Sequence, residues 1–212
     1  IKGTGANACR LAHNPDPEIL DICDRLGLLV MDENRTFSTE EGNMDVISNW
    51  IKTSRNHPSV IFYSIFNEEP LQGAEKGRKL AERIQAQVKK LEFHRLFPKT
   101  PAVGSETSSA FMVRGEYSTD YSRHVIGNYD EEAAPWGATI RDTWKAVNER
   151  PFIAGSFVWT GFDYGGEPSP FEWPSVSSFF GVFDRCGFKK DAYYLYKAFW
   201  SGKPVLHILP HW

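Results

Sequence analysis

The feature that most constrains the fold of this 212-residue chain is a regular alternation of short apolar runs with amphipathic segments. The apolar runs predict strands at residues 8–12, 28–31, 59–66, 102–104 and 152–159. The amphipathic segments predict helices at residues 17–26, 43–53, 74–91, 141–148 and 193–200. Because continuous apolar strands that alternate with helices are buried on both faces, the pattern indicates a parallel sheet covered by helices.

Polar side chains gather at the carboxyl ends of the expected strands, which is the edge that carries the chemistry in such folds. They are His13, Asp32, Glu33, Asn67, Glu68 and Glu106, and a further strand ends in Trp159. No glycine-rich phosphate loop follows any of these strands. The pattern therefore favours a (β/α)8 TIM-barrel over a doubly wound sheet.

Composition narrows the classes of partner. The net charge is −3, which predicts neither nucleic-acid binding nor attraction to an anionic membrane, and the apolar runs are too short to span a bilayer. Aromatic residues make up 14% of the chain; they suit a sugar-binding cleft, although core packing accounts for most of them. Cys9, Cys23 and Cys186 have no metal-ligand or redox-motif spacing, so we expect free, buried thiols.

Glu68 and Glu106 are the pair whose position calls for a chemical explanation. A carboxylate directly after a buried strand is seldom there for packing, although a surface salt bridge is the alternative for either residue alone. In retaining glycosidases, two carboxyl groups about 5–5.5 Å apart serve as nucleophile and as acid/base. The sequence makes Glu68 and Glu106 candidates for this chemistry, and no serine elbow or metal-ligand spacing competes with them.

Two histidines lie at opposite ends of the expected strands. His57 precedes the strand that leads to Glu68, on the face of a barrel that usually serves stability, so we expect it to form structural hydrogen bonds. His13 follows a strand on the opposite, active edge. It is a candidate site residue, with a purely structural role as the alternative.

Several motifs, spread over nearly the whole chain, carry a resemblance to a known family. They are Gly5–Pro15, Cys23–Gly27, Val30–Glu33, Arg55–Val60, Asn67–Glu69, Gly104–Ser109, Phe157–Tyr164, Gly166–Pro168 and His207–Trp212. Together they resemble glycoside hydrolase family 2, in particular its β-galactosidase branch. The resemblance implies that Glu68, directly after an asparagine, is the acid/base and that Glu106 is the nucleophile. It also implies that Asn67 hydrogen-bonds the 2-hydroxyl of the sugar.

The resemblance extends to the other substrate-binding residues. His13 and Trp159 would line the galactose pocket, and Arg10 would support the carboxylates. The Asn-x-Lys motif with which glucuronidases of the family grip a sugar acid is absent, which favours a neutral sugar. Residues 34–37 lack the acidic ligand of the magnesium-dependent members, so the expected metals and cofactors are none.

Length departs from the family pattern. Glu68 and Glu106 are 38 residues apart, whereas in the family they end the fourth and seventh strands, three units of about 30 residues apart. We therefore expect an incomplete barrel over residues 1–204, without its first strand and without about two β/α units near residues 91–94. Either residues have been left out of this sequence, or the chain is truly shortened. Residues 205–212 would begin a following β-sandwich domain.

The expected function is removal of terminal β-D-galactose from an oligosaccharide or glycoconjugate by a retaining mechanism. Two alternatives stay open: an inactive carbohydrate-binding or scaffold remnant of the barrel, and a relative that hydrolyses a glucuronide or mannoside. No nucleic-acid or membrane partner is expected, and oligomerisation through domains outside this sequence stays an alternative. The sequence favours neither a cytoplasmic nor a periplasmic or secreted location.

Overall fold

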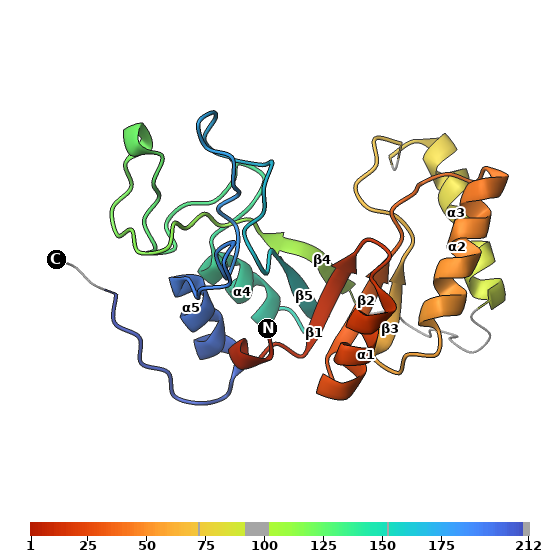
Figure 1. Ribbon diagram of the computed structural model, residues 1–212, viewed down its shortest axis with the longest axis horizontal. Helices are drawn as coiled ribbons and strands as arrows, with labels where there is room; N and C mark the ends of the chain where they lie inside the picture. Colours follow the sequence, from red (N-terminus) through yellow and green to blue (C-terminus); the bar gives the residue numbers. More distant parts are fainter. Residues whose placement is uncertain (72, 92–101, 152, 210–212) are drawn as a thin grey trace. The chain divides into compact units, whose positions relative to one another are not determined.

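The computed structural model describes residues 1–71, 73–91, 102–151 and 153–209 (Figure 1). It divides the chain into two compact units, each described here by itself. Unit 1 comprises Ile1–Ala6 and Pro101–Trp212, and unit 2 comprises Asn7–Thr100. Among the described helices, none combines the length and the apolar content that a membrane crossing requires.

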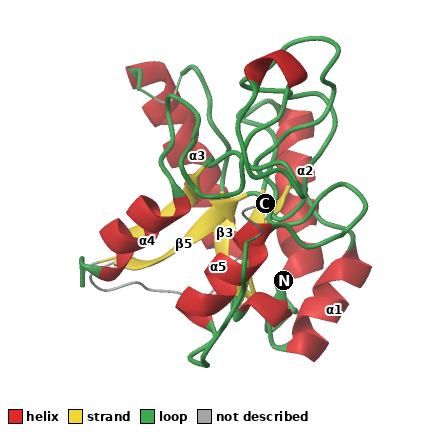
Figure 2. Ribbon diagram, turned by 90° about the vertical axis from the view of Figure 1, so that its left-hand side faces the viewer, coloured by secondary structure: helices red, strands yellow, loops and turns green. Residues whose placement is uncertain are grey.

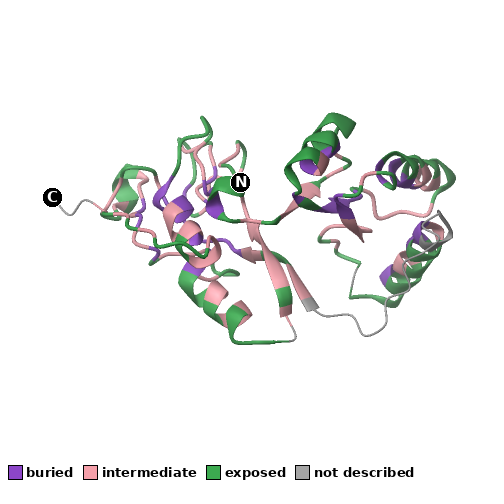
Figure 3. Cartoon of the chain, turned by 90° about the horizontal axis from the view of Figure 1, so that it is seen from below, coloured by how far each residue is buried: buried purple, intermediate pink, exposed green. Residues whose placement is uncertain are grey.

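Unit 2 is a parallel sheet with accompanying helices. Its strands are β1 (Ala8–Ala12), β2 (Leu29–Glu33) and β3 (Val60–Ser64), in the order β1-β2-β3. Its helices are α1 (Pro17–Leu26), α2 (Glu41–Ser54) and α3 (Glu75–Leu91). One core cluster joins α1 to the sheet through Leu20 and Val30, and another joins α2 to α3 through Ile47 and Ile84. Figure 3 shows the buried stretches on α2 and α3. The sheet with amphipathic helices is the arrangement that the alternating pattern predicts.

Helix α1 shows how local sequence sets an element's ends. The Asp16 side chain accepts a hydrogen bond from the Glu18 backbone N–H at 2.9 Å, and Pro17 occupies the first turn. Gly27 ends the helix in the left-handed conformation, with φ of 59°, and its N–H bonds back to the last turn. These contacts confirm the predicted start and stop signals.

Unit 1 holds a two-stranded parallel sheet and long loops (Figure 2). Its elements are η1 (Lys2–Thr4), β4 (Ala102–Ser108), η2 (Tyr121–Arg123), α4 (Ile140–Asn148), β5 (Ile153–Trp159) and α5 (Asp191–Trp200). One core cluster includes Tyr193 and Tyr196 of α5, and a second lies among the loops around Phe111 and Phe180.

Two strand boundaries differ from the sequence expectation in ways that matter for the site. β3 ends at Ser64, so Asn67 and Glu68 follow it at a short distance instead of directly. β4 continues to Ser108, because Thr107 and Ser108 still pair with β5 after an irregularity, so Glu106 lies within a strand. The described strands form a three-stranded and a two-stranded sheet, and no closed barrel is seen among these residues.

The cysteine prediction is partly wrong. All three thiols are free, and Cys23 is buried, but Cys9 is only half-buried and Cys186 is exposed. Cys186 lies in an exposed turn, where its backbone N–H donates to Asp184 Oδ1. The predicted junction near residues 91–94 falls mostly outside the described residues, as do residues 210–212 of the segment predicted to begin a following domain.

Asp32 of β2 yields a stability prediction. It is fully buried, and neither of its carboxylate oxygens has a well-formed hydrogen bond to a described residue. Burial raises the pKa of Asp32, a rise that the nearby Trp50 and Ser54 side chains oppose. Because the folded state holds this proton more tightly than the unfolded chain does, Asp32 lowers stability as the pH rises past its ordinary pKa of about 4.

We therefore expect Asp32→Asn to stabilise the protein by about 1–2 kcal/mol at pH 7 and to be nearly neutral at pH 4. Urea unfolding at several pH values measures this, with the exposed Asp45→Asn on α2 as the matched control. Equal effects of the two substitutions at pH 7 would contradict the prediction.

Candidate active site

In unit 2, predicted site residues converge on Glu33. This glutamate ends β2 and its side chain is 1% exposed. Arg10 of β1 forms a two-pronged ion pair with it, from Nε to Oε2 and from Nη2 to Oε1, both at 2.8 Å. The same Arg10 Nη2 donates to Asn67 Oδ1 at 2.6 Å. Arg10 thus fixes the asparagine that immediately precedes Glu68.

His13 joins the same group from the end of β1. Its Nδ1 lies 3.2 Å from Glu33 Oε1. Beside Asn67, Phe66 packs against Phe37 with ring centroids 4.3 Å apart. Glu68 itself is exposed. The result is an exposed carboxylate next to an asparagine that a buried ion pair holds in place.

His57 has the structural role that its position predicts. Its Nδ1 lies 2.7 Å from Asp24 Oδ2, and Asp24 Oδ1 accepts the Ser59 backbone N–H at 2.9 Å. Asp21, Asp24 and His57 have donor atoms close enough to share a metal ion. However, both Asp24 oxygens already bind the segment before β3, so the group acts as a brace between α1 and that segment.

In unit 1, Trp159 and Glu106 lie on neighbouring strands. Trp159 ends β5 and pairs in register with Ser108 of β4, two residues beyond Glu106. The Trp159 Nε1 donates to the Tyr164 hydroxyl at 3.1 Å, and the two rings meet edge to face. The Tyr164 hydroxyl in turn donates to Glu167 Oε2 in a short hydrogen bond. The loop after β5 therefore holds the indole through a chain of polar contacts.

Two negative charges act on the hydrogen-bonded series Trp159–Tyr164–Glu167. Burial raises the pKa of the Tyr164 hydroxyl, and the hydrogen bond to Glu167 and the charges of Glu167 and Glu106 raise it further. The Tyr164 hydroxyl therefore stays protonated and donates a hydrogen bond to Glu167, while its oxygen accepts one from the Trp159 indole N–H. Glu106 is exposed, and its charge is felt at the same phenol.

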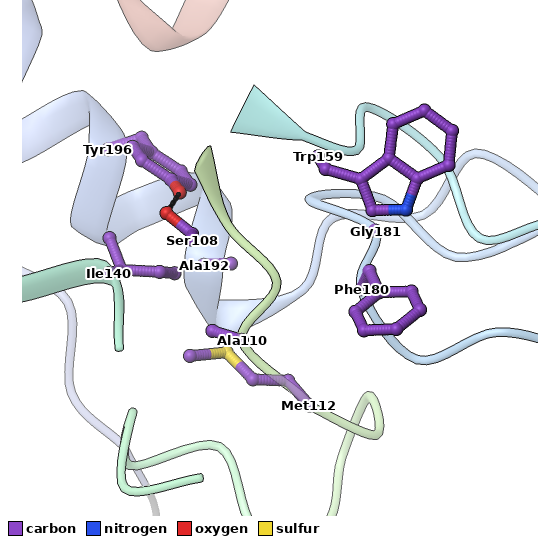
Figure 4. A pocket seen from close by; sticks show the side chains of 9 residues that line it. All are labelled: Ser108, Ala110, Met112, Ile140, Trp159, Phe180, Gly181, Ala192 and Tyr196. Atoms are coloured by element: carbon purple, nitrogen blue, oxygen red, sulfur yellow. Dashed lines mark hydrogen bonds between the residues drawn. The ribbon is translucent and has the colours of Figure 1, made fainter. Parts of the chain in front are cut away.

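A small pocket lies on the inner side of Trp159. Its wall includes Ser108, Met112, Phe180 and Tyr196, and its open volume is about 220 Å³ with the solvent at its mouth included. Figure 4 shows the Ser108 and Tyr196 hydroxyls turned toward one another, 3.1 Å apart, with the Trp159 ring on the other side. Small-molecule sites hold several polar groups that orient a ligand, whereas the Ser108 and Tyr196 hydroxyls here are already paired with each other. This mostly apolar hollow is therefore a packing gap behind Trp159.

A buried ion pair supports the same loop. The Lys190 Nζ lies 2.8 Å from Asp163 Oδ2 and donates to the Phe179 carbonyl at 3.1 Å. Asp163 Oδ1 accepts the Gly181 N–H at 2.7 Å. Gly181 is needed here, because a Cβ at this position would lie 2.3 Å from the Asp163 backbone nitrogen. The pair ties the residue before Tyr164 to residues 179–181.

These contacts separate the candidate residues into two groups. Arg10, His13, Asn67 and Glu68 belong to unit 2, and Glu106 and Trp159 belong to unit 1. That the Glu68 and Glu106 carboxyl groups act on one sugar stays a prediction. Sequence reasoning noted Glu33 as a strand-end acid but did not recognise it as the centre of its group, and it overlooked Tyr164 and Glu167 as partners of Trp159.

Comparison with known proteins decides the family. The sequence model described as "Glycosyl hydrolases family 2, TIM barrel domain" matches residues 1–172. The chain belongs to glycoside hydrolase family 2. Over its whole length it is 31% identical to the beta-galactosidase BoGH2A of Bacteroides ovatus, of which it covers 36%. It is 24% identical to a beta-glucuronidase of Bacteroides fragilis, with 98% of this chain and 38% of that protein covered.

Solved structures agree on the fold of this family 2 domain. The beta-galacturonidase of Eisenbergiella tayi matches 98% of the chain with a TM-score of 0.73 and 23% identity, over 46% of its own length. The family 2 chain thus spans less than half of the relatives it matches. The alignment with BoGH2A extends over 310 residues, more than the 212 of this chain, so that relative carries residues without a counterpart here.

Proposed function

We propose that this family 2 chain carries the catalytic residues of a retaining exo-β-galactosidase. The observation that carries the proposal is the Arg10–Glu33–Asn67 network, which holds the asparagine next to Glu68 at the end of the parallel sheet. A contact from Asn67 to the sugar 2-hydroxyl strengthens in the transition state of glycoside hydrolysis. Fixing Asn67 with a buried, two-pronged ion pair lowers the cost of orienting it during the reaction.

The proposed reaction has two steps. The Glu106 carboxylate attacks the anomeric carbon while the bond to the departing oxygen breaks, and Glu68 gives that oxygen its proton. The product is a galactosyl ester of Glu106. Glu68 then takes a proton from water, whose oxygen attacks the anomeric carbon and releases Glu106. His13 and Trp159 line the galactose subsite, and the substrate is a β-galactoside oligosaccharide or glycoconjugate.

The choice of galactose is supported by similarity and by a missing motif. BoGH2A, the 31% identical relative, is a beta-galactosidase, and no Asn-x-Lys sequence occurs in the chain. The second candidate is a uronic acid glycoside, favoured by the similarity to a beta-glucuronidase and to the fold of a beta-galacturonidase. Loss of about two β/α units would instead leave an inactive sugar-binding remnant.

A panel of 4-nitrophenyl β-glycosides tests the proposal. We expect kcat/KM for the β-galactoside to exceed that for the β-glucuronide, β-galacturonide and β-mannoside by at least about 100-fold. Each competitor differs from the galactoside in the position of a hydroxyl group or carries a carboxylate, so polar groups of the pocket would be left unpaired. Proton NMR during hydrolysis should show β-galactose as the first product. A uronide as best substrate would replace galactose by the second candidate, and binding without turnover would identify the remnant.

A further inference from the structure

The Glu167 carboxylate has a position that the proposed reaction does not explain. It lies in the loop after β5 and accepts a hydrogen bond from the Tyr164 hydroxyl, which in turn accepts one from the Trp159 indole N–H. The amide oxygen of a neutral glutamine would accept the same hydrogen bond from the Tyr164 hydroxyl. The negative charge therefore needs a separate reason.

No cation neutralises this charge within the described part of the chain. Glu167 is half-buried and forms no ion pair with a described residue. Arg185 approaches Gly165 of the same loop, but it is exposed and is not paired with Glu167. The buried Lys190 is committed to Asp163. The face that carries Trp159 therefore presents the charge of Glu167 beside the Tyr164 phenol.

We propose that Glu167 is a specificity-determining residue that disfavours sugars carrying a carboxylate. A sugar stacked on Trp159 beside Glu106 lies within range of a partly desolvated negative charge. A uronate there adds a like charge where the effective dielectric is well below that of water, whereas a neutral galactoside adds none. The inference rests on the proposed function, because it takes the sugar to sit on Trp159.

The test compares Glu167→Gln with the wild-type chain. Gln keeps an oxygen for the Tyr164 proton and removes only the charge. The matched control is Glu172→Gln, an exposed glutamate of the same loop region that alters the net charge equally. Thermal unfolding verifies that all three proteins are equally folded. NMR titrations with methyl β-galactoside and methyl β-galacturonoside give the two dissociation constants. Hydrolysis of 4-nitrophenyl β-galactoside and 4-nitrophenyl β-galacturonide gives the two kcat/KM values.

We expect Glu167→Gln to lower the ratio of the galacturonoside to the galactoside dissociation constant by about tenfold, and Glu172→Gln to leave this ratio unchanged. The effect of Glu167→Gln should shrink as salt is raised. An unchanged preference in Glu167→Gln, with galactoside hydrolysis intact, overturns this inference alone. Absence of galactoside hydrolysis by the wild type overturns the proposed function, and the binding ratio then still reports on Glu167. Binding of neither sugar overturns both.

Discussion

Glu106→Gln is expected to lower kcat for 4-nitrophenyl β-galactoside by about four orders of magnitude, the scale seen when an enzyme loses its covalent nucleophile. The physical reason is that an amide oxygen is a poor nucleophile, so the galactosyl ester does not form. Because Glu106 is exposed, exchanging its carboxylate for an amide of the same shape should leave folding unaffected. A loss of activity at unchanged melting temperature therefore reports on chemistry. Glu149→Gln, an exposed change after α4, serves as the control.

Glu68→Gln separates the two glutamates by role. A missing acid matters little when the departing group is already acidic, so this variant should hydrolyse a dinitrophenyl galactoside far better than an alkyl galactoside. Azide added to Glu68→Gln should yield β-galactosyl azide, because it attacks the ester of Glu106 from the face that water normally uses. Near-normal rates in both Glu106→Gln and Glu68→Gln, with every leaving group, would contradict the proposed mechanism.

Local sequence signals predicted the elements well where they act through nearest neighbours. The Asp16 cap, the Pro17 first turn and the Gly27 stop are contacts within a few residues, and α1 begins and ends where they indicate. The ends of β3 and β4 were predicted less well. Whether Thr107 continues β4 depends on its pairing with Val158, a contact with a distant strand that no local pattern contains.

The same contrast explains which parts of the site were predictable. Asn67 was visible as a polar strand end and Arg10 was found through the family motifs, and their hydrogen bond joins β1 to the segment after β3. Glu33 was visible as a strand-end acid, yet its central role depends on register, which places Arg10 of β1 beside the neighbouring strand β2. Tyr164 and Glu167 were part of a recognised motif, but their link to Trp159 depends on how the loop folds back.

The second large effect concerns the buried pair of Lys190 and Asp163, which supports the Trp159 loop. The Lys190 side chain is fully buried. Burial lowers the pKa of Lys190 and raises that of Asp163, and in each case the partner's charge opposes the change. Removing one partner leaves the other charge buried without compensation, which is far more costly than removing both.

We expect Lys190→Met to destabilise the protein by about 3–5 kcal/mol at pH 7. With its cation gone, Asp163 should hold a proton up to higher pH in the folded state than in the unfolded chain, so the deficit should shrink as the pH falls toward 4. The double variant Lys190→Met with Asp163→Asn should recover much of the loss, since the amide oxygen can still accept the Gly181 N–H. Urea unfolding at pH 4 and pH 7 measures all three effects. A cost below about 1 kcal/mol for Lys190→Met would mean that water reaches Asp163.

Because Asp163 adjoins Tyr164, Lys190→Met should also weaken galactoside binding under conditions where the chain is still folded, and the double variant should restore it.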